Sequence, residues 1–462
     1  MMTLPLNRHA VAKHPLFSSF KVDYLYALEY FLRKYGENNI QAREAFKVYE
    51  AKLSSKNPYS YCGDEKALEI VRLFLGTRFD VLTVHYRRYR TCLLMDCLFM
   101  LAYSDPDKAQ RILEDFCSLS VKRYHKLFYR LFDYLYAGNH SEPFKGISHI
   151  RHQIECWNAK KIFERKPLRK VLFTASMSAG KSTLINALIG KKITRTQSEA
   201  CTGKIHYIYN KPYEDDFTAK WEDAFNMNVS EDQLMNYDGN NDTVRVWTYF
   251  RSFLSDKFSW CLIDTPGVNF SLNSEHMNIT HKAIEQEAWD YLVYIINGEY
   301  PGTNDDKNHL EYIFRHVTDS KIIFVLNKLD RYSAKDDSIP DAVTKLRNDL
   351  EKIGFKNPII CPISAYTAML AKKCIFKTEF NSDEADEFDF LRRKFLKAEY
   401  DLSNYSAELI YSTGLTETDK TRRFNIPKRF LERKNPLESD CYQLLINSGL
   451  FGFEKILGLM PN

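Results

Sequence analysis

The chain has 462 residues, of which 44% are hydrophobic, 14% aromatic and 27% charged. This length suits about two or three domains, and the composition is typical of a globular protein that buries full cores. A net charge of +5 is small for the length, so it argues neither for nucleic acid nor for a membrane surface as a partner. The ten cysteines form no CxxC pair, which favours buried thiols in a reducing compartment over a disulfide framework.

The first residues lack the apolar core of a secretory signal. The longest apolar run, residues 93–103, is too short to span a bilayer and contains Asp96. We therefore expect a cytoplasmic protein whose membrane contact, if any, is peripheral at the inner face of a membrane. The basic run at residues 421–434 is the best candidate for contact with anionic lipid.

Residues 17–136 have helical patterning. In "RYHKLFYRLFDYLY" the apolar residues recur at helical spacing, and in "SDPDKAQRIL" Asp105 and Pro106 predict a helix start. Residues 136–146 are rich in Gly, Asn and Pro and read as a linker, followed by a short helix. The sequence thus predicts an all-α N-terminal domain over residues 1–140 and a linker with a lead-in helix over 141–169.

From residue 170 the pattern changes to short apolar runs separated by amphipathic stretches. Six runs read as strands: "KVLFTA", "KIHYIYN", "FSWCLID", "DYLVYIIN", "KIIFVLN" and "PIICPIS". Strands that alternate with helices predict an α/β domain with a mostly parallel sheet, here over residues 170–462.

The stretch "ASMSAGKS", residues 175–182, lies between the first of these strands and a helical segment. This is the position of a phosphate-binding loop, whose backbone amides and helix N-terminus cradle phosphates. Its first residue, Ala175, stands where the usual pattern has glycine. Lys181 would reach the β- and γ-phosphates and Ser182 would bind Mg²⁺. The residues expected to line the phosphates are Ala179, Gly180, Lys181, Ser182 and Thr183.

Later motifs predict which nucleotide is bound. "CLIDTPG" ends a strand with Asp264, placed to hold Mg²⁺, and with Gly267, placed to sense the γ-phosphate. In "LNKLD" the carboxylate of Asp330 can accept hydrogen bonds from guanine N1 and N2, and adenine offers no such pair. We expect GTP and GDP as ligands, with a base site built from Asn327, Lys328, Asp330 and the backbone of Ser364 and Ala365.

A threonine between the loop and "DTPG" is expected to complete the Mg²⁺ shell. Thr194, Thr196 and Thr202 are available. Thr202 directly precedes a predicted strand, so it is the preferred ligand, and the other two are expected to be ordinary loop residues. The metal ligands predicted from the sequence are therefore Ser182, Thr202 and Asp264.

These motifs resemble the GTPase domain of bacterial dynamin-like proteins. The similarity rests on "MSAGKSTLINALIG", the threonine of "EACTG", "LIDTPGV", "LNKLD", "ISAYTAMLAKK" and the closing "SGLFGFEKIL". It covers about residues 170–457, interrupted by insertions near 212–245 and 378–438. Era-type and septin-type GTPases share the five motifs but match the flanking residues less well. Residues 93–135 are similar to a TerB-like helical module.

The resemblance implies a large GTPase that self-associates through its GTPase domains, with hydrolysis stimulated by that pairing. Lys181, Ser178 and Thr202 are then the expected catalytic residues, with Lys181 and Ser178 stabilising transition-state charge. Met177 and Val268 stand where related GTPases place glutamines that position water, so neither can do so here. We expect slow turnover in the monomer.

Dynamins follow the GTPase domain with a helical stalk, and this sequence stops soon after "FEKIL". A membrane-acting enzyme would then need a dynamin-like or stalk-bearing partner protein. The alternatives are a nucleotide-switch scaffold that binds a protein through its N-terminal helices, and an Era-like RNA-associated GTPase. Of the three, nucleic-acid binding is the least expected.

Overall fold

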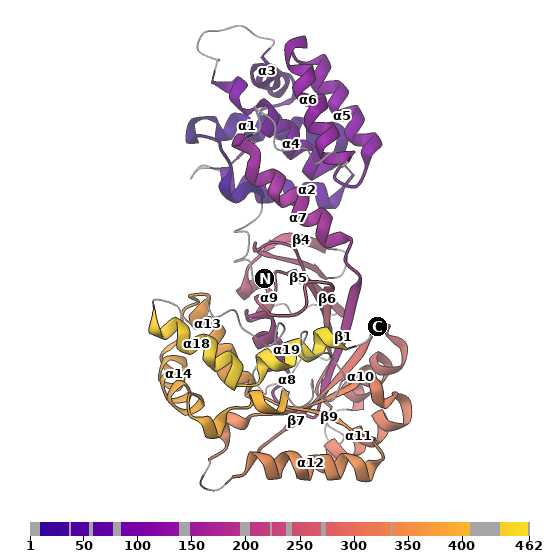
Figure 1. The fold of residues 1–462 in the computed structure, drawn as a ribbon. Helices are drawn as coiled ribbons and strands as arrows, with labels where there is room; N and C mark the ends of the chain where they lie inside the picture. Colours follow the sequence, from indigo (N-terminus) through magenta and orange to yellow (C-terminus); the bar gives the residue numbers. More distant parts are fainter. Residues whose placement is uncertain are drawn as a thin grey trace. The chain divides into compact units, whose positions relative to one another are not determined.

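The computed structural model describes residues 10–36, 38–54, 59–76, 85–137, 148–194, 204–221, 224–236, 243–268, 274–333, 335, 337–406 and 435–460. The chain divides into two compact units (Figure 1). The first comprises residues 1–165 and 211–230, and the second comprises residues 166–210 and 231–462. Residues 211–230, which fall mostly within the predicted insertion at 212–245, therefore belong with the N-terminal helices.

The described residues of the first unit up to residue 165 form helices and their connections, as predicted. Its helices are α1 (Lys21–Gly36), α2 (Ile40–Leu53), α3 (Asp64–Leu75), α4 (Arg90–Leu101), α5 (Pro106–Ser118), α6 (His125–Tyr136) and α7 (Arg151–Glu164). Residues 211–230 add an antiparallel hairpin, β3 (Phe217–Trp221) and β4 (Ala224–Val229), and β4 contacts α2.

Helix α4 is the centre of this unit, since nearly all of its residues are buried. Helix α5 starts where Asp105 and Pro106 predict, with the Asp105 side chain accepting a hydrogen bond from the Lys108 amide at 2.9 Å. The Phe116 ring stacks on Phe31 at 4.6 Å and meets Phe128 edge-on at 5.9 Å, which joins α1, α5 and α6 through one aromatic core.

The second unit is built on a mostly parallel sheet in the order β5-β2-β6-β1-β7-β8-β9. Its strands are β1 (Leu168–Ala175), β2 (Ile205–Asn210), β5 (Thr243–Thr248), β6 (Ser259–Asp264), β7 (Tyr291–Asn297), β8 (Ile322–Asn327) and β9 (Ile359–Pro362). Each neighbouring pair is parallel except β2 with β6. The six predicted strands are all present, and the α/β fold class is confirmed. Strand β5 was missed because its short alternating run lies in the predicted insertion.

The helices of the second unit are α8 (Lys181–Ile189), α9 (Glu231–Met235), α10 (Ser274–Gln286), α11 (Asn304–His316), α12 (Ile339–Ile353), α13 (Ala365–Ile375), α14 (Ser382–Phe395), α18 (Pro436–Asn447) and α19 (Leu450–Leu459). Helices α8, α13, α18 and α19 contact one another, and α11 contacts α12 (Figure 1). The last two helices of the chain therefore belong to the core of the α/β unit.

A buried ion pair fastens the C-terminal helices to the rest of this unit. Lys372 on α13 donates to Glu454 on α19 at 2.8 Å and to the Leu188 carbonyl of α8 at 3.0 Å. The second carboxylate oxygen of Glu454 accepts from the Phe253 amide at 3.0 Å. Burial lowers the pKa of Lys372 and raises the pKa of Glu454, and each partner opposes the shift of the other. Both charges are thus compensated inside the protein.

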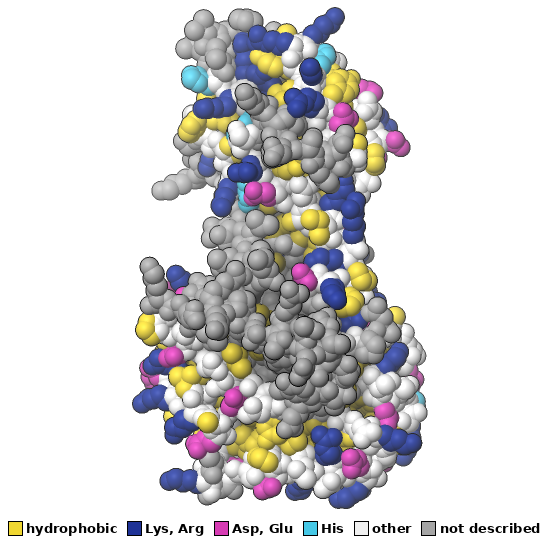
Figure 2. Space-filling view, in the orientation of Figure 1, with side chains coloured by type: hydrophobic (Ala, Val, Ile, Leu, Met, Phe, Trp, Pro, Cys, Tyr) yellow, Lys and Arg dark blue, Asp and Glu magenta, His cyan; other side chains and the backbone are white. Residues whose placement is uncertain are grey.

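Among the described residues, no helix combines the length and apolarity that crossing a membrane requires. The basic run at residues 421–434 lies outside the described part of the chain. On the face drawn in Figure 2, Lys and Arg side chains lie at several separate places on both units, with Asp and Glu side chains between them.

Replacing Glu454 by Gln should destabilise the second unit by about 3–5 kcal/mol, because it leaves the Lys372 ammonium buried without its counter-ion. The measurement is the free energy of unfolding in urea. The double change Lys372→Met with Glu454→Gln should recover part of the loss. Lys373→Met is the matched control on the same helix, since its pairing with Glu384 is partly exposed and should contribute at most about 1 kcal/mol. If Glu454→Gln and Lys373→Met lowered the free energy of unfolding equally, the Lys372–Glu454 pair would not have the structural role given to it here.

Candidate functional site

The loop between β1 and α8 has the backbone that a phosphate-binding loop requires. Ser178 and Gly180 have positive φ values of +61° and +85°. A Cβ atom at Gly180 would also lie 2.4 Å from Nδ2 of Asn327, so both the backbone and the surroundings demand glycine there. Ala175 is not among the positive-φ residues. It is the last residue of β1 and is fully buried, so an alanine fits this position.

The loop leads directly into the N-terminus of α8. Gly180 precedes the helix and supplies no side-chain cap, and the first turn contains no acidic residue. The first amides of a helix have no partner inside it, and they favour a negatively charged ligand. Lys181, Ser182 and Thr183 form this first turn and are partly exposed. Ser178 and Met177 are exposed at the tip of the loop.

The end of β6 brings a carboxylate to the loop. Asp264 is buried, and its Oδ1 pairs with the Lys181 ammonium. Beyond the strand, Val268 pairs with the loop itself: its amide donates to the Ala175 carbonyl at 3.0 Å, and its carbonyl accepts from the Met177 amide at 3.2 Å. The Val268 side chain is fully buried. This residue therefore fixes the loop through its backbone. A Cβ atom at Gly267 would make ordinary contacts with Met177 at 3.5 Å.

Of the three threonines considered for Mg²⁺, Thr196 and Thr202 lie outside the described residues. Thr194 is buried, and its hydroxyl lies 3.3 Å from the Ser182 carbonyl and 3.2 Å from Oδ1 of Asn186. The same Asn186 oxygen accepts from the amides of Ile193 and Thr194, and its Nδ2 donates to the Thr194 carbonyl. Asn186, to which sequence reasoning gave no role, thus ties the segment after α8 back to the helix.

Asn327 connects the phosphate-binding loop to the opposite side of the site. It ends β8, and its Nδ2 donates to the Ala179 carbonyl at 3.0 Å. Its Oδ1 accepts from the Ala365 amide at 3.1 Å, at the start of α13. Strands β1, β6, β7, β8 and β9 are mutually parallel, so their carboxyl ends meet at one edge of the sheet. One buried amide therefore links three of the loops at that edge.

The expected base-recognition residues also lie together. Asp330 is buried, and its Oδ1 accepts a hydrogen bond from the Ser364 hydroxyl at 2.8 Å. Lys328 has a positive φ of +65°, and its ammonium pairs with Glu299 at 3.0 Å. The backbone amides expected to reach guanine O6 donate within the protein: that of Ser364 to the Ser448 carbonyl at 2.9 Å, and that of Ala365 to Asn327. What joins Ser364 to Asp330 in the structure is the hydroxyl of Ser364.

Residues 171–329 match the model of the dynamin family. The matched segment begins in β1 and ends directly after β8, so it contains the phosphate-binding loop, Asp264 and Asn327. The match supports a dynamin-family GTPase domain over these residues, most of which lie in the second unit.

Two curated relatives match part of the chain. The first, an uncharacterized protein in the xynA 3' region of Caldicellulosiruptor sp., is 27% identical over 292 residues, covering 57% of this chain and 70% of the relative. The second, from Arabidopsis thaliana and named "Probable transmembrane GTPase FZO-like, chloroplastic", is 25% identical over 203 residues, covering 44% of this chain and 20% of that protein. A structure of an oligomerised bacterial dynamin pair covers 94% of this chain and 64% of its own, with 13% identity and a TM-score of 0.35.

A buried histidine supports the strand that leads into the phosphate-binding loop of the GTPase domain. The Nε2 atom of His309 on α11 lies 2.9 Å from the Thr174 hydroxyl, and the side chain is fully buried. Burial is the main cause that lowers the pKa of His309 to about 3, and the neighbouring His281 adds to it. The ring is therefore neutral at physiological pH. The sequence gave no signal for this residue, because the contact joins positions 135 residues apart.

The stability of the GTPase domain should fall in mild acid because of His309. Its pKa in the folded protein lies below the ordinary value of about 6.5, so its contribution is complete above that pH and is lost as the pH falls toward 3. We expect a loss of about 2 kcal/mol in the free energy of unfolding between pH 7.5 and pH 5 from this group alone. Urea unfolding at several pH values measures it.

The variant His309→Gln should show a shallower pH dependence than the wild type. His316→Gln, on the same helix and exposed, should leave the slope unchanged and serves as the control. An unchanged slope in His309→Gln would show that other groups cause the acid sensitivity.

Proposed function

We propose that this protein is a Mg²⁺-dependent GTPase that hydrolyses GTP to GDP and phosphate, with its activity stimulated by self-association of GTPase domains. The observation that carries the proposal is the Asn327 bridge. Its two hydrogen bonds hold the phosphate-binding loop and the start of α13 beside Asp330, so a phosphate site and a carboxylate suited to guanine lie at the same sheet edge. The family match over residues 171–329 supports the same activity.

In the phosphate half of the site, we assign roles to the phosphate-binding loop and to Asp264. Amides of Ala179, Gly180, Lys181, Ser182 and Thr183 surround the phosphates, and the Lys181 ammonium contacts the β- and γ-phosphates. Ser182, Thr202 and Asp264 hold Mg²⁺, and the Gly267 amide senses the γ-phosphate. In this proposal, Lys181 would contact a phosphate and Asp264 would help to hold Mg²⁺, so replacing the Lys181–Asp264 pair by these contacts would keep the charges balanced.

The base half of the site selects guanine. Asp330 accepts from guanine N1 and N2, and the Ser364 hydroxyl on its Oδ1 fixes the plane of the carboxylate. The Lys328 stem lies over the base, with its ammonium held by Glu299. The buried position of Asp330 strengthens discrimination, because a ligand without both donors would leave acceptor positions of a buried carboxylate unfilled, beyond the one that Ser364 occupies.

The loop chemistry favours slow hydrolysis in the isolated chain. Met177 carries no group that can orient water, and the Val268 side chain is turned into the core. The exposed Ser178 hydroxyl is available to stabilise charge at the loop tip, as the resemblance implies. A second GTPase domain would then complete the site and raise the rate.

The first test is GTP hydrolysis per molecule as a function of protein concentration, with and without liposomes of anionic lipid. A rate that rises with concentration supports a self-associating GTPase, and a further rise with liposomes supports action at a membrane surface.

Lys181→Ala should lower kcat/KM by at least about 100-fold, because it removes a cation that contacts the transition state. Equal rates for wild type and Lys181→Ala would refute the assignment. A flat rate indifferent to lipid would favour a nucleotide switch that binds a protein partner.

Changing Asp330 to Asn should change which base is accepted. The amide would replace an acceptor by a donor, so it loses the guanine N2 contact and gains a hydrogen bond to the oxygen that xanthine carries at the same carbon. We expect GTP affinity to fall by about 100-fold or more, since the contact is to a charged, buried group, and xanthosine triphosphate to bind better than GTP. Competition binding measures both. Asp341→Asn, at the exposed start of α12, is the control.

A further inference from the structure

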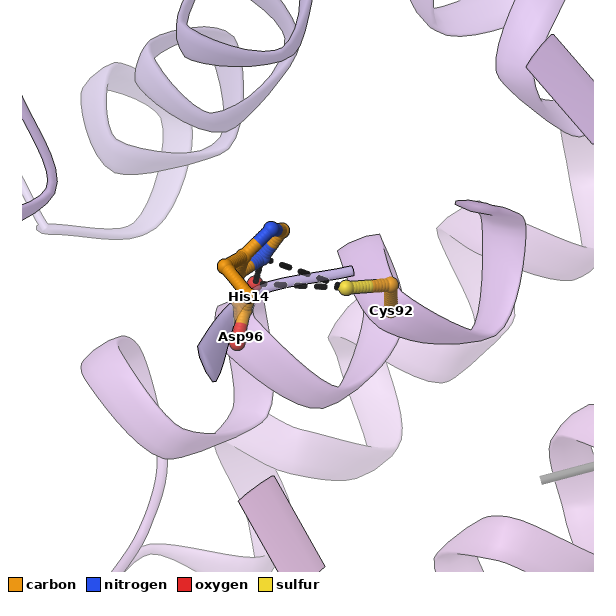
Figure 3. A group of neighbouring side chains, drawn as sticks. All are labelled: His14, Cys92 and Asp96. Carbon is orange, nitrogen blue, oxygen red and sulfur yellow. Dashed lines mark hydrogen bonds and ion pairs between the residues drawn. The ribbon is translucent and has the colours of Figure 1, made fainter. Parts of the chain in front are cut away.

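Three side chains from two distant segments of the helical unit converge at one point (Figure 3). Nε2 of His14 lies 2.8 Å from Oδ2 of Asp96 and 3.2 Å from Sγ of Cys92, and the sulfur lies 3.8 Å from the same carboxylate oxygen. Cys92 and Asp96 stand one turn apart on α4, and His14 directly follows a short 3₁₀ helix, Ala10–Lys13. All three side chains are buried.

This arrangement does not suit nucleophilic catalysis. In a nucleophile–histidine–acid triad, the acid and the nucleophile bind opposite nitrogens of the imidazole, so that a proton can be relayed. Here one nitrogen, Nε2 of His14, meets both Cys92 and Asp96. The cluster is also enclosed in the core, without exposure that would admit a substrate. The nitrogen of His14, the sulfur of Cys92 and the oxygen of Asp96 instead point to one place, as ligands around a single metal ion do.

The distances agree with such an ion. Tetrahedral zinc has bonds of about 2.0–2.3 Å to N, O and S ligands, which places pairs of ligand atoms about 3.4–3.6 Å apart. The two separations from Sγ of Cys92, 3.2 and 3.8 Å, lie within about 0.2 Å of that range. The 2.8 Å between Nε2 of His14 and Oδ2 of Asp96 is a hydrogen-bond distance, and it would lengthen by about 0.6 Å around a metal. The ligand types exclude a hard cation, because thiolate and imidazole select zinc-like metals and Mg²⁺ or Ca²⁺ prefer oxygen.

Polar groups surround the cluster as supporting contacts would. The hydroxyls of Tyr24 and Tyr49 donate to the two oxygens of Asp96, the latter at 3.0 Å. The side-chain nitrogen of Gln153 lies 3.1 Å from Sγ of Cys92, and no described residue bonds its buried Oε1. Rotating this amide by half a turn would bring Oε1 to the sulfur side of the cluster, where it could serve as a fourth ligand.

We propose that His14, Cys92 and Asp96 form a structural Zn²⁺ site, with Gln153 as the nearest fourth ligand. Two anionic ligands and a neutral imidazole balance the charge of the ion, so the buried site is neutral. The metal ties the segment before α1 to the central helix α4. It stabilises the helical unit independently of the nucleotide.

Binding releases protons, because the metal takes the thiolate and the unprotonated Nε2 of the ring. Zinc affinity should therefore increase with pH.

The test uses the full-length protein, stripped with a chelator and then held in excess Mg²⁺ with GDP so that the nucleotide site is saturated. Zn²⁺ is added, and bound metal, proton release and thermal stability are measured. We expect about one tightly bound Zn²⁺ per chain, a rise in the melting temperature, and a thiolate-to-metal absorption band when Co²⁺ replaces Zn²⁺. The proposal would be overturned if the protein bound Zn²⁺ no more strongly than a metal-binding dye does and if Zn²⁺ left the melting temperature unchanged.

Variants locate the site. Cys92→Ser should weaken Zn²⁺ binding by more than about 100-fold, and Tyr49→Phe by about 10–100-fold, since supporting groups of metal ligands have effects of that size. Cys97→Ser is the matched control, because Cys97 is equally buried on the same helix and is not part of the cluster. Equal zinc affinity in Cys92→Ser and Cys97→Ser would overturn the assignment. If Cys92→Ser does not fold, the Co²⁺ absorption spectrum of His14→Gln is measured instead. A thiolate-to-metal band identical to that of the wild type would overturn the assignment of His14 as a ligand.

Discussion

The hydrogen bonds of the Asn327 side chain are the constraint on which the GTPase domain depends most. One amide group accepts from α13 and donates to the phosphate-binding loop, and it lies so close to Gly180 that no other residue fits there. A hydrophobic side chain could fill the same space but could not satisfy the Ala179 carbonyl and the Ala365 amide together. The loop before α8 and the loop before α13 are therefore positioned by one residue, and the ligand meets a preorganised edge.

Two buried ion pairs of the α/β unit differ in exposure, and this difference separates their roles. Lys372 and Glu454 are sealed in the core and fasten helices together. Lys181 and Asp264 lie at the ligand edge, where the Lys181 side chain keeps some exposure. A fully buried ion pair contributes only to the stability of the fold, because no ligand can reach it. A pair at the edge can exchange partners with a phosphate and a metal, so the same chemistry becomes part of binding.

Much of the α/β half could be predicted from sequence, because parallel strands buried on both faces read as continuous apolar runs and the phosphate-binding loop follows one of them directly. The order of the motifs then placed Asp264, Asn327 and Asp330 at strand ends. What the sequence did not reveal depends on distant contacts. The Ser364 hydroxyl on Asp330, His309 beneath β1, and the pairing of Lys372 with Glu454 each join residues separated by 34 or more positions. Strand β5 carried too short an alternating pattern to stand out from its surroundings.

The proposed stimulation by self-association follows from the composition of the loop tip. Positive φ at Ser178 turns the loop outward, and Met177 is 39% exposed next to the phosphate-binding amides. A thioether there can neither orient water nor stabilise charge, but it offers a flexible apolar surface that adapts to a neighbour. A second GTPase domain that covers Met177 would exclude bulk water from the γ-phosphate and strengthen every electrostatic contact within the site. In this proposal, Met177 would both keep hydrolysis slow in the monomer and contact the partner domain.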